Sequence, residues 1–531
     1  MPRNLIICCD GTGNIWGNED DTNVVKLTRT LVNDDQQILY YDPGVGTSNI
    51  YPSIGWWNRR KADLSKLVGL AYGGGVYENI GEAYGFLVEH YQRGDRIYVF
   101  GFSRGAFTAR CVAGMVNLFG IVRRGTETMI PTLTRIYFQP SKVKGRADKT
   151  REESADDIRR VFTLDGRDAR VYFVGVWDTV SSVGGLPFSK QNITSSATIS
   201  GKNFDHVRHA VAAGEYRYGY APRLYTRQVG EERKVLNFDD DQKSLKQLWF
   251  AGAHSDVGGS YREDGLSNCS LKWMLEEAIA KGLQCDAAKV SAINSNPLGL
   301  AHDQAFMQPL WALAGLHTRL IPRDAARHAS LESRRASAKP PQTIWRPFWK
   351  NTSALLWVAA MVFLLLTIFA LDKEACLFNY CVKFDWTRLS TFVSGGEMDD
   401  VFRIIDSNWM AIRYYVDFLF IGVYTMAICW LLVYARRTLA ERSVNVTVHH
   451  IALWWGLVPL WTLIVSDVLE NVLTLALLPD TPSAPASHAW LSWLLASLTV
   501  IKLVSLLAIA GFFAWVVVFG MMVEKRSDVM V

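Results

Sequence analysis

Residues 98–110 read YVFGFSRGAFTAR, which places a serine between two glycines at the junction of a predicted strand and a predicted helix. A short apolar run ends in Gly101, and a second apolar segment begins after Gly105. The pattern Gly-x-Ser-x-Gly between a strand and a helix is typical of a nucleophile elbow, because glycine permits the sharp turn. We therefore expect Ser103 to project above a sheet edge, at a helix N-terminus that favours developing negative charge.

Similar apolar runs alternate with amphipathic stretches through residues 1 to about 320. Nearly continuous apolar runs are what a parallel sheet covered on both faces requires. Strands that alternate with helices predict an α/β domain with a mostly parallel sheet. We expect residues 123–165, which are basic and then mixed in charge, to form an insertion or cap outside the sheet. The predicted strands are 5–9, 37–41, 96–102, 170–177 and 248–251, and the clearest helical patterns are 76–91 and 105–118.

A serine becomes a nucleophile only beside a base, and the base needs an acid to hold its tautomer. In α/β-hydrolases the chain order is Ser, then Asp or Glu, then His. Asp178 ends the apolar run VYFVGVW, and His254 follows the run LWFA in a glycine-rich loop. His206 and His209 lie in a stretch, FDHVRHAVAA, that looks helical. We therefore favour His254 as the base.

Two other acidic residues compete with Asp178 for the role of the acid. Asp256 is so close to His254 in sequence that it is better suited to shaping the loop, and Asp205 is a weaker rival. Asp10 could instead join a metal site with Asp178 or Asp256. Because the spacing of these residues shows no ligand cluster, we expect no metal and no other cofactor.

An oxyanion hole needs backbone N–H groups aimed at the developing charge. The amide of Arg104, directly after the serine, should supply one of them. The second should come from the loop after the first strand, which reads DGTGN at residues 10–14. Gly11 or Thr12 is the best candidate there, whereas Asp10 could simply cap an ordinary strand-to-helix turn.

The C-terminal third changes character and contains four long apolar runs. Each is long enough to cross a bilayer, and Trp and Tyr residues near their ends fit interfacial belts. We expect a catalytic domain at 1–321, a basic juxtamembrane linker at 322–350, and an all-α transmembrane domain of about four helices at 351–531. The predicted spans are 353–371, 417–435, 451–478 and 503–523.

Charge sets the expected orientation and excludes one class of partner. Lys and Arg gather before the first span, between the second and third, and after the fourth, which places the catalytic domain and the C-terminus in the cytoplasm. We therefore expect a multi-pass protein of a bacterial-type inner membrane. The net charge of +5 and the absence of a recognition motif argue against nucleic acid. Cys376 and Cys381 would face the exterior, either bridged or as free thiols.

The third span carries polar residues on one helical face. Asp467, Glu470 and Asn471 share this face, and Lys502 at the start of the fourth span is a candidate partner. Ionisable groups at membrane depth usually face a bundle interior or a cavity. These residues could form a packing cluster, a contact in a homo-oligomer, or a cavity for a lipid headgroup or an ion. The last option would suit a membrane transport or signalling protein whose hydrolase fold only binds ligand.

Several motifs, taken in order, resemble the DUF2235 family, which is related to type VI secretion lipase effectors of the Tle1 type. They are the DGTGN start, YDPGVGT at 41–47, GFSRGAFTAR at 101–110, VGVWDTV at 174–180 and FAGAHSDVGG at 250–259. The resemblance implies an α/β-hydrolase fold and a triad of Ser103, Asp178 and His254. Similar effectors hydrolyse the acyl esters of phospholipids.

The four predicted spans depart from the secreted effectors of that family. They would fix the enzyme in its own membrane, beside lipid, which would then be both substrate and environment. The sequence therefore predicts a membrane-anchored serine hydrolase that cleaves carboxylic esters, with phospholipid acyl esters as the favoured substrates. A thioesterase or small-ester hydrolase is the alternative within the enzyme class.

Overall fold

The structure is a computed structural model. It describes residues 2–11, 20–44, 74–139, 151–163, 169–180, 204–229, 232–235, 244–319, 321–322, 325–337, 407–442, 446–477 and 489–522. Thr12, the predicted first span 353–371, and Cys376 and Cys381 lie outside these residues. The internal contacts of the chain define two units. The α/β unit consists mainly of Met1–Asp303 and Arg319–Ile344, and the helical unit of Gln304–Thr318 and Trp345–Met530.

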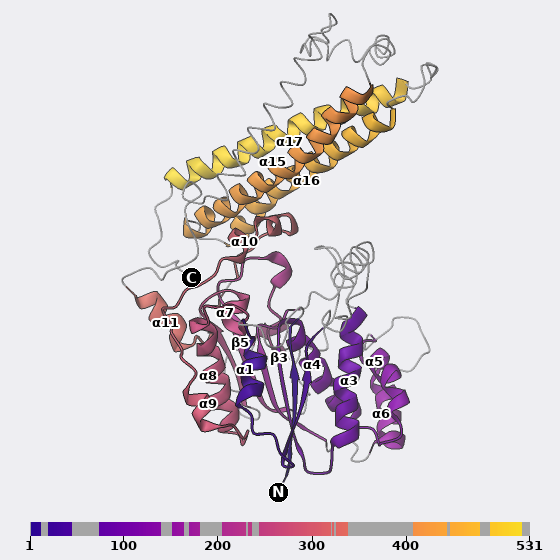
Figure 1. The fold of residues 1–531 in the computed structure, drawn as a ribbon, viewed down its shortest axis with the longest axis vertical. Helices are drawn as coiled ribbons and strands as arrows, with labels where there is room; N and C mark the ends of the chain where they lie inside the picture. Colours follow the sequence, from indigo (N-terminus) through magenta and orange to yellow (C-terminus); the bar gives the residue numbers. More distant parts are fainter. Residues whose placement is uncertain are drawn as a thin grey trace, which may run out of the picture. The chain divides into compact units, whose positions relative to one another are not determined.

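The α/β unit is built on a six-stranded sheet in which every strand is parallel to its neighbours. The spatial order is β2-β1-β3-β4-β5-β8, and Figure 1 shows the sheet with strands β3 and β5 labelled. This confirms the predicted α/β class and the mostly parallel sheet. The strands are β1 (Asn4–Cys9), β2 (Gln37–Asp42), β3 (Arg96–Phe102), β4 (Val171–Trp177), β5 (Phe204–Ala212) and β8 (Ser244–Phe250).

Helices cover both faces of the sheet, which explains why its strands are apolar on both sides. On one face, buried residues of α3 (Gly74–His90), α4 (Ser103–Phe119) and α6 (Arg151–Phe162) pack in a single core with the strands. On the other, α1 (Asn23–Thr30) and α8 (Gly265–Ile279) do the same (Figure 1).

The order of the strands creates a switch point between β1 and β3. From β1 the chain passes to β2 on one side, and all later strands of the sheet are added on the side of β3. In open α/β sheets, ligands bind in the crevice at the carboxyl ends of the strands where the order reverses. Cys9 pairs with Gly101 in the register, so the residues that follow β1 and β3 emerge side by side at this edge.

The described part of the segment 123–165, which we predicted to be an insertion or cap outside the sheet, forms helices and contributes no strand to the sheet. It contains η1 (Glu127–Met129), α5 (Ile130–Tyr137) and α6. A separate antiparallel pair, β6 (Thr226–Val229) and β7 (Glu232–Val235), also lies outside the main sheet.

The helical interpretation of residues 204–212 was wrong, because they form strand β5 between β4 and β8. Two polar residues of this strand, Arg208 and His209, have partners that are distant in sequence. Arg208 donates to Glu277 of α8 at 2.6 Å, and the Nδ1 atom of His209 lies 2.8 Å from Oε1 of Gln247 on β8.

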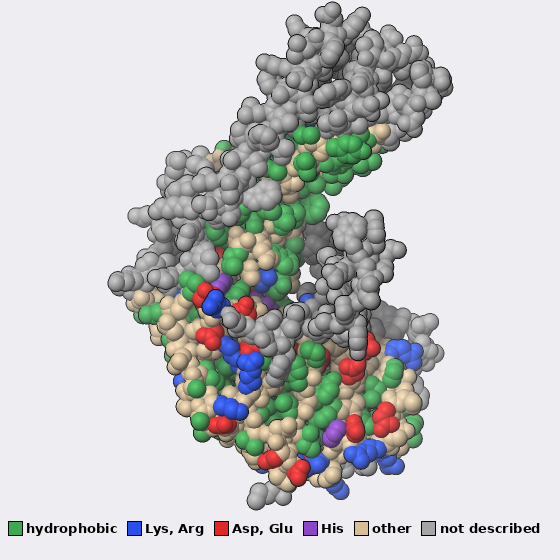
Figure 2. Space-filling model, in the orientation of Figure 1, with side chains coloured by type: hydrophobic (Ala, Val, Ile, Leu, Met, Phe, Trp, Pro, Cys, Tyr) green, Lys and Arg blue, Asp and Glu red, His purple; other side chains and the backbone are tan. Residues whose placement is uncertain are grey.

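The helical unit contains three long helices that lie alongside one another: α15 (Ser407–Arg442), α16 (Val446–Leu477) and α17 (Ala489–Met522). Each contains a segment long and apolar enough to cross a membrane, at Tyr415–Arg436, Trp454–Leu473 and Ser497–Val516. Hydrophobic side chains dominate their visible surface, whereas charged side chains are scattered over the α/β unit (Figure 2). Short helices α10 (Gln304–Met307) and η3 (Pro309–Ala314) pack on α15.

Candidate active site

Ser103 lies on a strained turn at the junction of β3 and α4. Its φ angle is 59°, a left-handed value that side chains rarely adopt outside functional turns. The two flanking glycines are sterically required. A Cβ at Gly101 would lie 2.5 Å from the carbonyl oxygen of Gly105, and one at Gly105 would lie 2.2 Å from the carbonyl oxygen of Cys9. The motif thus lets α4 pass directly against the end of β1.

His254 comes from the loop after β8 and begins the short helix α7 (His254–Gly258). Its Nε2 atom lies 2.8 Å from Oγ of Ser103. The Phe102 ring packs against the imidazole, with 4.6 Å between the ring centroids. Gly258 makes room for that ring, since a Cβ there would lie 1.9 Å from it.

Asp178 follows β4 and is fully buried. Its Oδ2 atom lies 2.6 Å from Nδ1 of His254, and its Oδ1 atom accepts a hydrogen bond of 3.0 Å from the amide of Ala212. Its φ angle of 37° is again left-handed. Ser103, His254 and Asp178 therefore form one hydrogen-bonded chain at the carboxyl ends of β3, β8 and β4.

A fourth residue, which the sequence reasoning missed, completes this chain. Arg319 is buried, and its guanidinium grips both carboxylate oxygens of Asp178, with Nη1 2.6 Å from Oδ1 and Nη2 2.9 Å from Oδ2. The same two nitrogens also donate to the carbonyl oxygens of Ala212 and Tyr220. Nothing in the sequence around Arg319 marks it, because it lies in no motif and is 141 residues from its partner.

The surroundings set the charges of this chain. Burial alone would raise the pKa of Asp178, but the Arg319 charge and the hydrogen bond with His254 outweigh it and hold that pKa well below its usual range. Burial lowers the pKa of His254, although its contact with Asp178 acts in the opposite direction. At neutral pH the imidazole is therefore neutral and the carboxylate is ionised, which are the states that a base and its orienting acid need.

A buried ion pair between Glu215 and Arg217 contacts the loop that carries His254. Glu215 accepts a hydrogen bond of 3.3 Å from the His254 amide and pairs with Arg217 at 2.8 Å. The guanidinium of Arg217 lies over the Tyr220 ring, which in turn contacts the His254 ring edge-on. The sequence reasoning also missed these residues, whose partners are settled only in the folded chain.

Asp256, the rival acid of the sequence reasoning, shapes the loop. One oxygen accepts from the amides of Ala253 and His302, both at 2.8 Å, and the other lies 2.7 Å from Nδ1 of His302. Asp205, the weaker rival, lies on β5 and makes an ion pair of 3.8 Å with Arg170. Neither carboxylate has a hydrogen bond to His254 in the structure.

The loop after β1 lies directly beside the serine turn. A Cβ on Gly105 would lie 2.3 Å from the carbonyl oxygen of Asp10. The Asp10 carboxylate is buried and accepts hydrogen bonds from Thr22, Tyr41 and the Gly11 amide, the last at 2.6 Å. It therefore holds the loop in place, and in this state the Gly11 amide points to it.

The N-terminus of α4 presents backbone donors at the serine. Among the residues that the structure describes, no side chain caps this helix end. The first amides of a helix have no partner within the helix, so those near Ser103 and Arg104 are available to a substrate oxygen. Among the described residues, no group of three or more His, Cys, Asp or Glu side chains is arranged to hold a metal ion.

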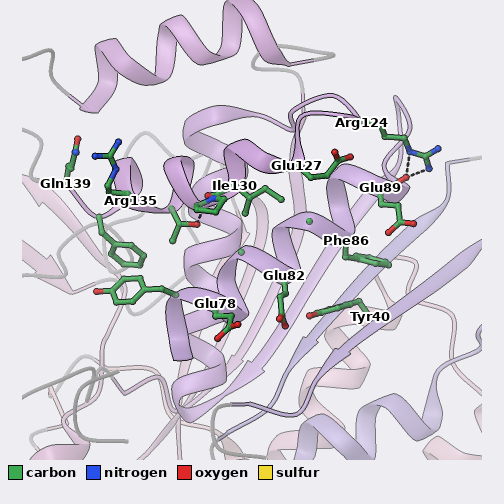
Figure 3. Close-up of a pocket in the computed structure, with 16 residues that line it drawn as sticks. Tyr40, Glu78, Glu82, Phe86, Glu89, Arg124, Glu127, Ile130, Arg135 and Gln139 are labelled. Atoms are coloured by element: carbon green, nitrogen blue, oxygen red, sulfur yellow. Dashed lines mark hydrogen bonds between the residues drawn. The ribbon is translucent and has the colours of Figure 1, made fainter. Parts of the chain in front are cut away.

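A large groove lies elsewhere in the α/β unit. It has a volume of about 1490 Å³ and lies between α3 and α5 (Figure 3). Four glutamates point toward it, together with aromatic rings such as Tyr40 and Phe86. None of the candidate site residues lines this groove: its acidic residues are Glu78, Glu82, Glu89 and Glu127.

In the helical unit, the polar face noted in the sequence finds partners on both neighbouring helices. Lys502 of α17 pairs with Asp467 and, at 3.0 Å, with Glu470. The Tyr424 hydroxyl of α15 donates to Asp467 at 2.8 Å. The Asn471 amide donates to Asp417 of α15, also at 2.8 Å. These contacts tie the three helices together.

The parallel sheet with a serine turn at its switch point defines an α/β-hydrolase-like catalytic domain. Comparison with known proteins gives the family. A model described as "T6SS, Phospholipase effector Tle1-like, catalytic domain" matches residues 3–277, and the chain belongs to this family. The resemblance predicted from the motifs is thereby confirmed.

Two similar proteins carry no assigned activity. An uncharacterized protein of Saccharomyces cerevisiae, YEL023C, is 33% identical over 235 residues, which cover 42% of this chain. The chain spans only 33% of the length of that protein. A crystal structure of an uncharacterized protein from Pseudomonas aeruginosa shares 16% identity and a TM-score of 0.35, covering 74% of this chain and 58% of the other.

Proposed function

We propose that this protein is a membrane-anchored serine hydrolase that cleaves the acyl esters of phospholipids. The observation that carries the proposal is the hydrogen-bonded chain from Ser103 through His254 to Asp178, in the crevice at the switch point of the sheet. Membership of the Tle1-like phospholipase family supports the substrate class.

In the proposed reaction, Ser103 Oγ attacks the acyl carbonyl while His254 Nε2 takes its proton. His254 then gives that proton to the leaving alkoxide, which departs as an alcohol and leaves an acyl-serine. A water molecule, deprotonated by the same nitrogen, hydrolyses the acyl-enzyme and restores Ser103. Asp178 holds the imidazole with Nε2 free to accept and stabilises its charged form. The reaction requires no metal.

The oxyanion would form beside the N-terminus of α4. There the amide of Arg104 directly follows the serine, no side chain of the described residues caps the helix, and the helix end favours negative charge. A second donor would come from the loop after β1. Thr12 is the better candidate of the two predicted residues, since the Gly11 amide is engaged by Asp10.

The three apolar helices support the membrane anchor. We propose that they lie in an inner membrane of bacterial type, with the catalytic domain and the C-terminus on the cytoplasmic side. Lys and Arg near the predicted span ends favour this orientation. Such an anchor holds the enzyme beside its lipid substrate, and the helices offer a surface for a homo-oligomer.

Covalent labelling tests the nucleophile. The full-length protein in detergent is treated with a fluorophosphonate probe, and wild type is compared with Ser103→Ala. We expect labelling of wild type and none of the variant. The matched control is Ser291→Ala, which removes an exposed serine on α9 (Ala287–Ser291) and should label as wild type does. Unlabelled wild type, folded and supplied with lipid, would contradict the proposal.

A substrate panel tests the class. Phospholipid vesicles, an acyl thioester and a short p-nitrophenyl ester are compared by kcat/KM. Preference for the vesicles supports a phospholipase. Preference for the thioester or the short ester would replace the lipid assignment with a thioesterase or small-ester hydrolase, while the serine mechanism would stand.

A further inference from the structure

The path of the chain around Arg319 links two parts of the molecule. The chain leaves the α/β unit after Asp303, contributes Gln304–Thr318 to the helical unit, and re-enters the α/β unit at Arg319. The residues at the two ends of this excursion both hold the candidate active site. His302 binds Asp256 in the histidine loop, and Arg319 binds Asp178.

Within the helical unit, the excursion is fixed by specific contacts. The indole N–H of Trp430 on α15 donates to the carbonyl oxygen of Phe306 at 3.3 Å, and that of Trp461 on α16 donates to Leu313 at 2.9 Å. The Phe306 ring also packs edge-on against Tyr434. The segment that precedes Arg319 is therefore part of the helical packing and not an independent loop.

We infer that Arg319 is a positioning residue for the candidate acid Asp178, and that the excursion Gln304–Thr318 delivers it there. The inference rests on the proposed function, because it assigns Asp178 its role in the triad. It adds that the geometry of the acid depends on a segment anchored among the apolar helices.

The geometry explains why the acid needs such a partner. Asp178 is fully buried, and a buried carboxylate without a compensating charge is costly. A single backbone amide, that of Ala212, binds it besides His254 and Arg319. The planar guanidinium fork fixes both oxygens at once, which a lysine ammonium cannot do. It therefore sets the direction in which Asp178 faces the imidazole.

Two substitutions separate charge from geometry. Arg319→Met removes both, and we expect kcat to fall by about 100-fold, as for a misplaced catalytic group. Arg319→Lys keeps the charge without the fork, and we expect a loss of about tenfold, equivalent to one charge-assisted hydrogen bond. Both are measured per active site, titrated with the fluorophosphonate probe, so that a lower folded fraction does not count as a lower kcat.

The pH profile provides a readout that a structural role alone would not move. The charged groups around His254 are Asp178 after β4, Glu215 and Arg217 after β5, and Arg319 behind Asp178. Removing the Arg319 cation leaves the carboxylate uncompensated, which favours the imidazolium. The acidic limb of kcat/KM should therefore move to higher pH in Arg319→Met and stay in place in Arg319→Lys.

A double-variant cycle tests whether Arg319 acts through Asp178. In an Asp178→Asn background, Arg319→Met should cause no further loss of kcat, because the group that it positions is already gone. Independent, multiplicative losses would overturn the inference. So would wild-type kcat and an unmoved pH limb in Arg319→Met. In either case a wild type that labels at Ser103 would leave the proposed function standing.

The delivery by the excursion is tested with an insertion. Two glycines placed between Ala314 and Gly315 lengthen the connection to Arg319 and replace no contact residue. We expect kcat to fall toward that of Arg319→Met. The same insertion after Gly94, in an exposed turn with no atom near its Cβ position, should leave kcat within about twofold. Equal activity of the two insertion variants would refute the delivery.

Discussion

Replacing Asp178 by asparagine is the most direct test of the candidate triad. Oδ1 accepts hydrogen bonds from the Ala212 amide and Arg319 Nη1, and Oδ2 from His254 Nδ1 and Arg319 Nη2. Each oxygen thus faces two N–H donors. The amide nitrogen of asparagine, itself a donor, would meet two donors in either orientation.

The cost follows from these contacts. If the asparagine NH2 group faces His254, Nδ1 must lose its proton to accept a hydrogen bond from it. In that tautomer Nε2 carries the proton and cannot act as a base. We expect kcat to fall by about 10⁴-fold, as for other triads that are held in the wrong tautomer. That loss equals about 5.4 kcal/mol in the activation barrier. Because Arg319 loses its counter-charge, stability should also fall by about 3–5 kcal/mol.

The assay is the rate of fluorophosphonate labelling at Ser103, with ester turnover measured in parallel and folding checked by circular dichroism. Asp205→Asn is the matched control, because Asp205 lies on the same sheet, on β5, and its ion pair with Arg170 is a loose one of 3.8 Å. It should label within about twofold of wild type. If Asp178→Asn labelled within tenfold of wild type while Asp256→Asn did not label, the reasoning would be refuted and Asp256 would be the acid.

Three further outcomes follow from the structure. Gly105→Ala should abolish labelling and lower the melting temperature, because the added Cβ would lie 2.2 Å from the carbonyl oxygen of Cys9. Gly219→Ala is the control: no atom lies within 4 Å of its added Cβ, so it should match wild type in both measurements. The acidic limb of kcat/KM should lie below the ordinary His pKa of about 6.5, because burial lowers the pKa of His254 and the base must be neutral; a limb above 7 in a pH–rate profile would contradict this. Lys502→Met should lower the free energy of unfolding in detergent by about 1–3 kcal/mol, and with it the melting temperature, because Asp467 loses its cation. An unchanged melting temperature would show that this ion pair does not contribute to stability.

Local patterns in the sequence predicted much of the fold of the α/β unit. Apolar runs longer than a turn, separated by helical patterns, predicted the parallel sheet, and the strand–glycine–serine–glycine–helix sequence predicted the elbow. These features depend on neighbours in sequence: a strand covered on both faces must be apolar, and a left-handed turn between β3 and α4 must be flanked by residues without a Cβ.

The wrong prediction of a helix at residues 204–212 shows a limit of such local patterns. The stretch FDHVRHAVAA looked helical in the sequence, although its residues 204–212 form strand β5. In the strand, Arg208 donates to Glu277 of α8, and His209 is hydrogen-bonded to Gln247 of β8. A polar residue in a sheet is identified by its partner, and the partner is remote in sequence.

The sequence alone pointed to the candidate residues for the chemistry, namely a serine between two glycines, an acid at a strand end and a histidine in a glycine-rich loop, and to the apolar runs in the C-terminal third. The tertiary structure alone decided how they are held. It placed Arg319 on Asp178, Asp256 on His302 and Glu215 behind His254, across separations of 141, 46 and 39 residues. Turns and strands are encoded by nearest neighbours, whereas the pairing of buried charges is decided only when folding brings distant segments together and removes water from them.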